Sequence, residues 1–255
     1  MNLRLEAALA LRYKSSSQKA RVLTEAWVAS NIYCPACGID IKKYESNRPV
    51  ADFYCAKCIE EYELKSKINS VGSKIVDGAH KTMLERLASD NVPNLFLLSY
   101  SLQDYSVLDF LIIPKHFFVS SIIERRAPLS IGARRAGWVG CNILLDGIPS
   151  SGRIFYIKNR HVQSRDIVLG TWKKTLFLRD EKEDLRKGWI LDVMRCIDSL
   201  GKKEFNLDEI YAFEKDLRVL HPNNRHIKDK MRQQLQFLRD KGYLSFIGKG
   251  RYGLI

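Results

Sequence analysis

Four of the six cysteines are spaced as metal ligands. Two C-x-x-C pairs flank residues 38–54, and two further cysteines stand alone; the pairs are Cys34 with Cys37 and Cys55 with Cys58, and the lone residues are Cys141 and Cys196. Each short pair directs two thiolates toward one ion, so the pattern is typical of a four-cysteine zinc site. A C-x-x-C pair alone is also a redox-active dithiol motif, which is the alternative. The lone cysteines are expected to be buried packing residues.

A second group of reactive residue types surrounds the second cysteine pair. Residues 50–54 and 59–67 alternate with the period of two that β-strands have, so Asp52 is expected on one strand and Glu63 and Lys65 on one face of the next. The residues expected to share faces are Val50, Asp52 and Tyr54 on the first strand, and Glu61, Glu63, Lys65 and Lys67 against Tyr62 and Leu64 on the second.

Two carboxylates and a lysine placed in this way suit phosphodiester cleavage. Asp52 and Glu63 would hold Mg²⁺ with waters and the backbone carbonyl of Leu64, because a hard cation prefers oxygen ligands. Such an ion polarises a phosphate and acidifies a water, while Lys65 orients that water and stabilises the developing negative charge. The alternative is an ordinary solvated strand face. Glu60 is expected to be solvated in either case.

The composition indicates a polyanionic partner. The chain of 255 residues has a formal net charge of +13, and its 45% hydrophobic content allows a sizeable core. Nucleic acid is the expected partner. A membrane is not, since no segment approaches the length of apolar sequence that spans a bilayer and residues 1–21 lack a signal-peptide pattern. We therefore expect a cytoplasmic protein, and no coiled coil or large apolar face argues against a monomer.

The chemical residues and their surroundings resemble the PD-D/ExK nucleases. The motif is Asp52 followed by Glu63 and Lys65, with Ala51 where that family usually has proline. The resemblance continues through "NRPVADFYC", "ELKSK", "RRAGWVGCNI", "GRIF" and "IKDKMRQQLQFLRDK". Taken together, these segments resemble the Dam-replacing protein family of methyl-directed restriction endonucleases, which join a zinc-bearing nuclease core to a C-terminal winged helix.

The resemblance implies an endonuclease that cuts double-stranded DNA at GATC when the adenine is N6-methylated. It implies that Asp52 and Glu63 bind the catalytic Mg²⁺, that Lys65 lies beside the nucleophilic water, and that the two cysteine pairs bind structural zinc. Two alternatives stay open: a zinc-containing winged-helix transcription regulator, and a structure-selective DNA repair nuclease.

Hydrophobic periodicity predicts a mixed sheet flanked by helices, and then a helical segment. Helices are predicted over 18–31 and 77–90, a polar turn over 66–75, and strands over 94–100, 106–114 and 152–157. The dense charges at 178–188 place a boundary between a nuclease domain, 1–180, and a winged-helix domain, 181–255. The second domain is predicted to have helices over 189–200, 207–220 and 225–242 and a hairpin over 243–255, with a capping box from Asn206 to Glu209. The fold class is thus α/β, with a restriction-endonuclease-like mixed sheet, a zinc element and a winged helix.

Two segments are candidates for reading DNA. The first is a basic pair followed by a tryptophan, Arg134, Arg135 and Trp138, for which a turn with a packed indole is the alternative. The resemblance implies that Trp138 lies against the methyl groups of the recognised adenines, and a flat apolar ring suits a methyl group.

The second segment is the helix predicted over 225–242. Its polar candidates are Arg225, His226, Lys228, Arg232 and Gln233, while Ile227, Met231, Leu235 and Leu238 have core spacing. Phosphate contact or simple solvation is the alternative for any one basic residue. His226 is equally a candidate helix cap or core partner. The hairpin is expected to offer Lys249 and Arg251 to phosphates.

Overall fold

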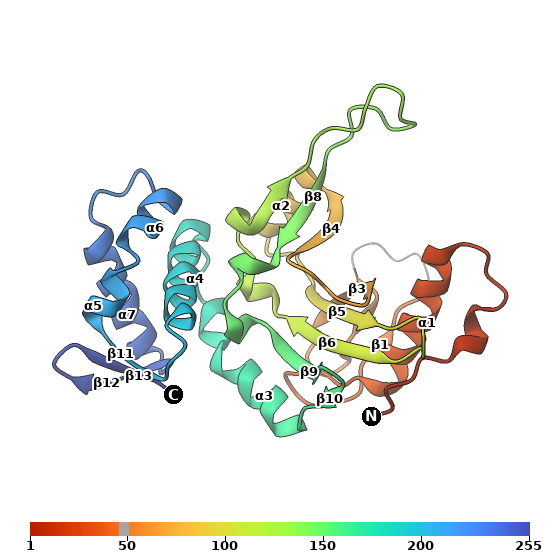
Figure 1. Ribbon diagram of the computed structural model, residues 1–255, viewed down its shortest axis with the longest axis horizontal. Helices are drawn as coiled ribbons and strands as arrows, with labels where there is room; N and C mark the ends of the chain where they lie inside the picture. The colour runs from red at the N-terminus through yellow and green to blue at the C-terminus, as the bar shows by residue number, and fades with distance from the viewer. Residues whose placement is uncertain (46–50) are drawn as a thin grey trace. The chain divides into compact units, whose positions relative to one another are not determined.

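The computed structural model describes residues 1–45 and 51–255, and these form two compact units (Figure 1). Unit 1 consists of Met1–Asp146 and Ser151–Lys173, and unit 2 consists of Gly147–Ser150 and Lys174–Ile255. The boundary expected between residues 180 and 181 stays a prediction.

A seven-stranded mixed sheet forms the centre of unit 1, in the order β1-β2-β3-β5-β6-β9-β10. Strand β3 runs parallel to β5 and the other neighbours are antiparallel. The strands are β1 (Lys42–Lys43), β2 (Phe53–Tyr54), β3 (Glu61–Ile68), β5 (Asn94–Tyr100), β6 (Val107–Ile113), β9 (Ile154–Lys158) and β10 (His161–Val162).

Helices α1 (Ser16–Asn31) and α3 (Arg165–Lys174) flank this sheet (Figure 1), whereas α2 (His80–Ala88) packs against a smaller sheet of unit 1. Short 3-10 turns connect the elements: η1 (Ala7–Ala10), η2 (Lys115–Phe117), η3 (Ser120–Ile122), η4 (Leu145–Gly147) and η5 (Ser150–Gly152). Helix α1 packs on the sheet through Trp27, whose ring meets Phe110 edge to face at 5.5 Å. Phe96 stacks on Tyr62 of β3 at 4.6 Å, so the strand that carries the candidates Glu63 and Lys65 is anchored in the aromatic core.

A second, three-stranded sheet has the order β4-β8-β7, with β4 at Lys74–Ala79, β7 at Ile123–Arg125 and β8 at Gly140–Leu144. The segment 126–139 between β7 and β8 extends away from the core (Figure 1). The predicted polar turn over 66–75 is shorter in the structure, because β3 continues to Ile68 and β4 begins at Lys74. The predicted helix start at residue 77 is wrong, because residues 74–79 form β4 and the helix begins at His80. Ile75 of β4 is buried opposite Ile143, a partner far along the chain that local periodicity does not reveal.

The predicted strands otherwise lie close to the observed ones. The apolar runs at 94–100 and 106–114 correspond to β5 and β6, which are largely buried. The strand predicted over 50–54 is shorter in the structure, since Asp52 immediately precedes β2. Val50 lies outside the described residues.

Unit 2 contains a bundle of helices and a three-stranded sheet with the order β11-β13-β12. Its elements are η6 (Leu176–Arg179), α4 (Asp184–Ser199), β11 (Glu204–Asn206), α5 (Leu207–Tyr211), α6 (Glu214–Leu220), α7 (Ile227–Asp240), β12 (Leu244–Gly248) and β13 (Arg251–Leu254). The capping box is confirmed, because the Asn206 side chain accepts from the Glu209 N–H and the Glu209 carboxylate accepts from the Asn206 N–H. The single helix predicted over 207–220 is wrong, because Phe213 has φ −82° and ψ 8° and separates α5 from α6.

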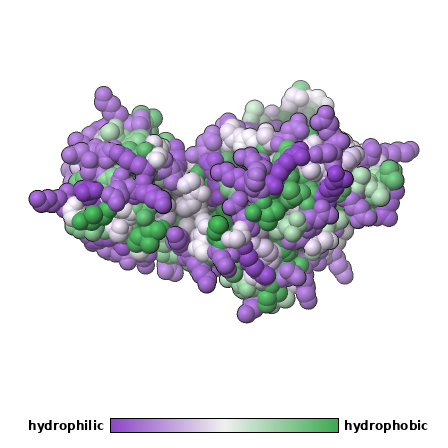
Figure 2. Space-filling model, turned by 60° about the horizontal axis from the view of Figure 1, so that its bottom comes forward, coloured by the Kyte–Doolittle hydropathy of each residue, from purple (hydrophilic) through white to green (hydrophobic). Residues whose placement is uncertain are grey.

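The face turned to the viewer in Figure 2 is dominated by hydrophilic residues, with hydrophobic ones in separate small patches. No helix among the described residues is long and apolar enough to cross a membrane.

Candidate active site and zinc cluster

The structure brings Asp52, Glu63 and Lys65 together at one edge of β3. The Lys65 ammonium lies 2.5 Å from Glu63 Oε1, and the Leu64 N–H donates to Asp52 Oδ2 at 2.7 Å. The Asp52 N–H donates to the Tyr62 carbonyl at 2.9 Å. Asp52 therefore extends the hydrogen-bonded pairing of β2 with β3 by one residue, at the position just before β2 begins.

This pairing also determines where the Leu64 carbonyl points. In an extended strand the N–H and C=O of one residue face the same edge, so the Leu64 carbonyl faces the edge that Asp52 occupies. Carboxylates of Asp52 and Glu63 and a backbone carbonyl form an oxygen-donor set of the kind that Mg²⁺ prefers. These residues therefore fit the predicted cation, and the assignment of the ligands stays a prediction.

A cavity of about 400 Å³ opens in front of these groups. Helix α1 supplies part of its wall with two side chains that sequence reasoning missed, Arg21 and Glu25. The Glu25 carboxylate is buried and accepts from Arg21 at 2.6 Å and from Lys43 at 2.8 Å. The spacing of Arg21 and Glu25, four residues apart on a predicted helix, was the available signal.

Burial perturbs all three groups. Burial raises the pKa of the Asp52 carboxyl above its usual range, although the hydrogen bond from the Leu64 N–H opposes the shift. Burial likewise raises the pKa of Glu63, against the attraction of Lys65. The pKa of Lys65 is raised, since the charges of Glu63 and Asp77 outweigh the opposing effect of burial. Perturbed, buried ionisable groups in a cavity are typical of functional sites.

Asp77 of β4 is the second partner of Lys65 and was also missed by sequence reasoning. Its Oδ1 lies 2.8 Å from the Lys65 ammonium, and its side chain is only 12% exposed. Asp77 was missed because a helix, and not strand β4, was predicted to begin at this residue.

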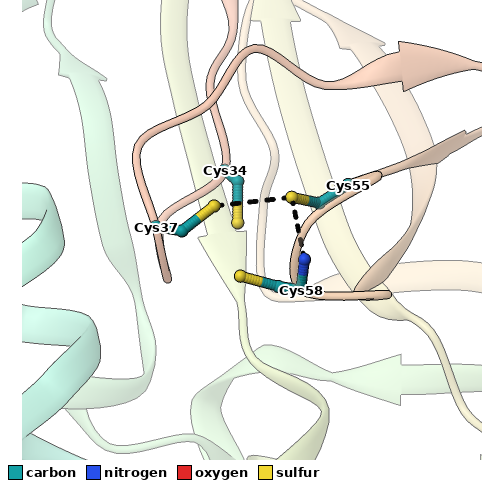
Figure 3. Close-up of side chains that lie close together, drawn as sticks. All are labelled: Cys34, Cys37, Cys55 and Cys58. Carbon is teal, nitrogen blue, oxygen red and sulfur yellow. Dashed lines mark hydrogen bonds between the residues drawn. The ribbon is translucent and has the colours of Figure 1, made fainter.

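The four paired cysteines form one cluster, as Figure 3 shows. Their sulfur atoms all lie within 4.8 Å of one another, and no other group of at least three potential ligands among the described residues meets this criterion. Sulfur ligands about 2.3 Å from a tetrahedral zinc are separated by slightly less than 4 Å, so the cluster has the size that zinc requires. The cysteines therefore fit a zinc ion.

The two knuckles share one backbone geometry. Gly38 N–H donates to the Cys34 carbonyl at 2.8 Å, and Ile59 N–H donates to the Cys55 carbonyl at 2.9 Å. Both donor residues have positive φ, 78° for Gly38 and 58° for Ile59. Because the second knuckle connects Asp52 to β3, an ion in this cluster would fix the connection between the candidate catalytic carboxylates. The lone cysteines are buried, as expected.

The remaining charged residues of this segment, Glu60, Glu61 and Lys67, all have hydrogen-bond partners within the protein. Glu60 was expected to be solvated, but it is only 8% exposed and accepts from the Asn94 side chain at 2.9 Å, because the tight knuckle turns it inward. Glu61 accepts from the Tyr44 hydroxyl at 2.7 Å. Lys67 donates to the carbonyls of Val71 and Lys74, so it secures the β3–β4 turn.

The basic candidates of unit 1 lie on the extended segment 126–139. Arg134 and Arg135 are exposed, and the Arg135 guanidinium lies over the half-buried Trp138 ring at 4.8 Å. Gly140 permits this ring position, since a Cβ built there would lie 2.8 Å from the indole. The segment therefore presents an aromatic ring among cations, and its contact with DNA stays a prediction.

Five of the candidates of unit 2 lie just before α7 or in its first half, although the helix begins two residues later than predicted. Arg225 precedes it and His226 occupies the N-cap position without a side-chain cap bond. The polar candidates Arg225, His226, Lys228, Arg232 and Gln233 are exposed, whereas Ile227, Met231, Leu235 and Leu238 are buried as expected.

Three of the candidates in unit 2 also have acidic partners within the protein. Lys228 lies 3.5 Å from Glu214, Arg251 lies 2.8 Å from Glu204, and the His226 ring lies 3.7 Å from Asp229. Lys249 is exposed in the β12–β13 turn.

These features define a class of protein, namely a mixed α/β core of the restriction-endonuclease type with a four-cysteine cluster, together with a winged-helix DNA-binding domain. A family model for the DpnI Dam-replacing family matches residues 1–181, and a model for the Dam-replacing helix-turn-helix domain matches residues 185–253. The chain belongs to the Dam-replacing family. Its membership indicates a nuclease with a DNA-binding helix-turn-helix domain, and the expected fold class is confirmed.

Proposed function

We propose that the protein is a Mg²⁺-dependent type II restriction endonuclease that cuts double-stranded DNA at GATC sites carrying N6-methyladenine. The observation that carries the proposal is the convergence of Asp52, Glu63 and Lys65 on one cavity at the edge of β3. Family membership supports the nuclease class. A transcription regulator has no need for buried carboxylates with perturbed pKa values beside a lysine.

The residues of the cavity have separate roles in this reaction. Asp52, Glu63 and the Leu64 carbonyl would hold the cation, which supplies polarisation of the scissile phosphate and a more acidic water. Lys65 holds the attacking water beside the phosphate and stabilises the negative charge that develops there. The four-cysteine zinc has a structural role, since all its ligands are thiolates and no position is left for a substrate.

Both domains would read the methylated site. Trp138 offers an apolar ring to the adenine methyl groups, while Arg134 and Arg135 hold the neighbouring phosphates. In the winged helix, Arg225, His226, Lys228, Arg232 and Gln233 would face the major groove, where Arg232 and Gln233 would contact bases. Lys249 and Arg251 would contact phosphates.

Matched plasmids test this proposal directly. Plasmid DNA with and without adenine methylation is incubated with the protein, with Mg²⁺ or with no added divalent ion, and the products are separated by size. We expect discrete fragments only with methylated DNA and Mg²⁺. Equal cleavage of both plasmids would favour a repair nuclease, and binding without cleavage would favour a regulator; either result contradicts the proposal.

Lys65→Ala separates cleavage from binding. The variant should lose cleavage while its affinity for methylated DNA in a gel-shift assay is largely retained, because the lysine acts on the attacking water. Lys67→Ala is the matched control, since it removes a lysine two residues along β3 whose ammonium binds backbone carbonyls instead. The control should still cut methylated DNA.

A further inference from the structure

The Lys65 ammonium is held by carboxylates from two different sheets. Glu63 lies two residues earlier on the same strand, and Asp77 comes from β4 of the three-stranded sheet. Asp77 is the more buried of these two partners, at 12% exposure against 25% for Glu63. Lysine has a long, flexible side chain, so its position depends on what binds the ammonium.

The two partners differ in what they can do during the reaction. Glu63 is a proposed ligand of the cation, and a carboxylate that binds a cation attracts the neighbouring ammonium less strongly. Asp77 has no such role, so its contact with Lys65 persists when Glu63 binds a cation. Lys65 therefore keeps one fixed partner that is not a proposed ligand of the cation.

The backbone around Asp77 is built to direct this side chain. The pairing of β4 with β8 shifts register between Asp77 and Ala79, and Gly78 is the intervening residue. Such an irregularity bends a strand and changes where its side chains point. The Gly78 carbonyl accepts from the Cys141 thiol at 3.5 Å, which holds the bulge against β8.

The same strand pair supports the DNA-reading candidate. Asp77 is paired with Cys141, only three residues after Trp138, and the His80 N–H donates to the Val139 carbonyl at 3.1 Å. Figure 1 shows β4 beside β8, with the segment 126–139 leading directly into β8. Asp77 thus connects the sheet that carries Trp138 to the lysine of the proposed active site.

From this geometry we infer that Asp77 is a positioning residue: it holds the Lys65 ammonium in the cleavage site and couples its position to the sheet that carries the DNA-reading segment. The inference rests on the proposed nuclease function. It assigns Asp77 no contact with the phosphate or with the attacking water.

Single-turnover cleavage tests the positioning role. In Asp77→Asn, which has the same shape without the charge, the cleavage rate constant on methylated DNA should fall roughly 10- to 100-fold, the scale of a misplaced catalytic group. The dissociation constant for the same DNA should change less than about threefold. Asp77→Glu, which restores the charge, should recover part of the rate. An Asp77→Asn protein that folds normally and cuts at the wild-type rate would overturn the inference and leave the proposed function intact.

Glu124→Gln is the matched control. Glu124 lies on β7 of the same small sheet and also pairs with a lysine, Lys74, at 2.6 Å, but it has no contact with Lys65 among those the structure gives. Its loss should leave the cleavage rate unchanged. An equal loss of rate in both variants would mean that any broken ion pair in this sheet lowers activity, and it too would overturn the inference.

A thermal double-mutant cycle tests the contact without any nuclease assay. The wild type, Lys65→Met, Asp77→Asn and the double variant are unfolded under identical conditions, and contacting residues should give non-additive changes in stability. Additive changes would overturn the inference whatever the cleavage assays give. If the cycle is non-additive but the wild-type protein cuts no DNA, the contact between Lys65 and Asp77 stands and the proposed nuclease function is wrong.

Discussion

At the scale of single residues, the proposed site combines groups that are costly to keep charged. Asp52 and Glu63 both have raised pKa values because they are buried, and Lys65 compensates only part of that cost. A site that binds a cation has to retain these charges, since protonated carboxyls are poor ligands. The arrangement therefore makes the metal-free protein less stable, and the same charged carboxylates allow it to bind a cation.

Asp52→Asn should separate these two effects. Because the folded protein binds the Asp52 proton more tightly than the unfolded chain does, stability falls as pH rises from the ordinary carboxyl pKa through the raised one. The asparagine keeps an acceptor for the Leu64 N–H and removes the charge. In Mg²⁺-free buffer the variant should melt at a higher temperature than wild type near pH 8, and this difference should disappear near pH 3. Its cleavage rate should fall by about 10³-fold or more, the loss of several kcal/mol of charge stabilisation.

Asp104→Asn provides a control of opposite sign. The pKa of the exposed Asp104 is lowered, mainly by the hydrogen bond that its carboxylate accepts from the Ser106 hydroxyl, so removing this charge should not raise the melting temperature at any pH. An Asp52→Asn protein that is less stable than wild type at pH 8 would contradict the explanation by burial.

Gly140→Ala tests the position of Trp138. The added Cβ would lie 2.8 Å from the outer edge of the indole, so the ring must move while the backbone can stay. We expect the preference for methylated over unmethylated DNA, measured as a ratio of cleavage rates, to fall about tenfold, the scale of a lost apolar contact. Gly132→Ala, where a Cβ meets nothing within 4 Å, is the control and should retain the preference.

At the scale of elements, the second cysteine knuckle connects β2 to β3 and so determines how these strands meet. The second knuckle separates Asp52 from Glu63 and turns the chain between them, and Tyr62 donates from β3 to the Cys34 sulfur at 3.2 Å. The cluster therefore directly contacts β3, the strand of the proposed catalytic residues. Its loss should displace the carboxylates without removing a reacting group.

Cys55→Ser should lower zinc content, stability and cleavage together. The expected loss of zinc is measured by metal analysis, and the melting temperature is measured in the same preparation. Cys196→Ser is the control, since Cys196 is a buried cysteine of α4 outside the cluster, and this variant should keep its zinc. A fully active and stable Cys55→Ser protein would contradict the structural role.

At the scale of the whole molecule, the net charge of +13 predicts binding that depends strongly on salt. Replacing the exposed pair Arg134 and Arg135 by alanine should reduce the slope of log affinity against log salt by about 2, roughly one for each phosphate contact. Replacing the exposed Lys173 of α3 is the control and should leave the slope unchanged. Fluorescence anisotropy between about 50 and 200 mM salt would measure both. An unchanged slope in the double variant would exclude phosphate contacts by this pair.

The sequence predicts those parts of the molecule that depend on local pattern. Strands β5 and β6 are continuous apolar runs, the cysteine pairs have recognisable spacing, and the alternation after Cys58 correctly places Glu63 and Lys65 on one face. Strand β4 escapes prediction because it is held by β8, more than sixty residues later, and contains only one buried apolar residue. Asp77 is missed with it, as are Arg21 and Glu25, because contacts between distant elements create the rest of the cavity.

The position of the second knuckle predicts that a chelator removes the two proposed metal ions, Mg²⁺ and zinc, at different times. A brief exposure would remove a solvent-accessible Mg²⁺ and stop cleavage in a way that fresh Mg²⁺ reverses. Long exposure would also extract the zinc proposed for the cysteine cluster, which lies between the two halves of the proposed site, and after that Mg²⁺ alone would no longer restore activity. The activity that fresh Mg²⁺ restores should therefore decrease as the time in chelator increases.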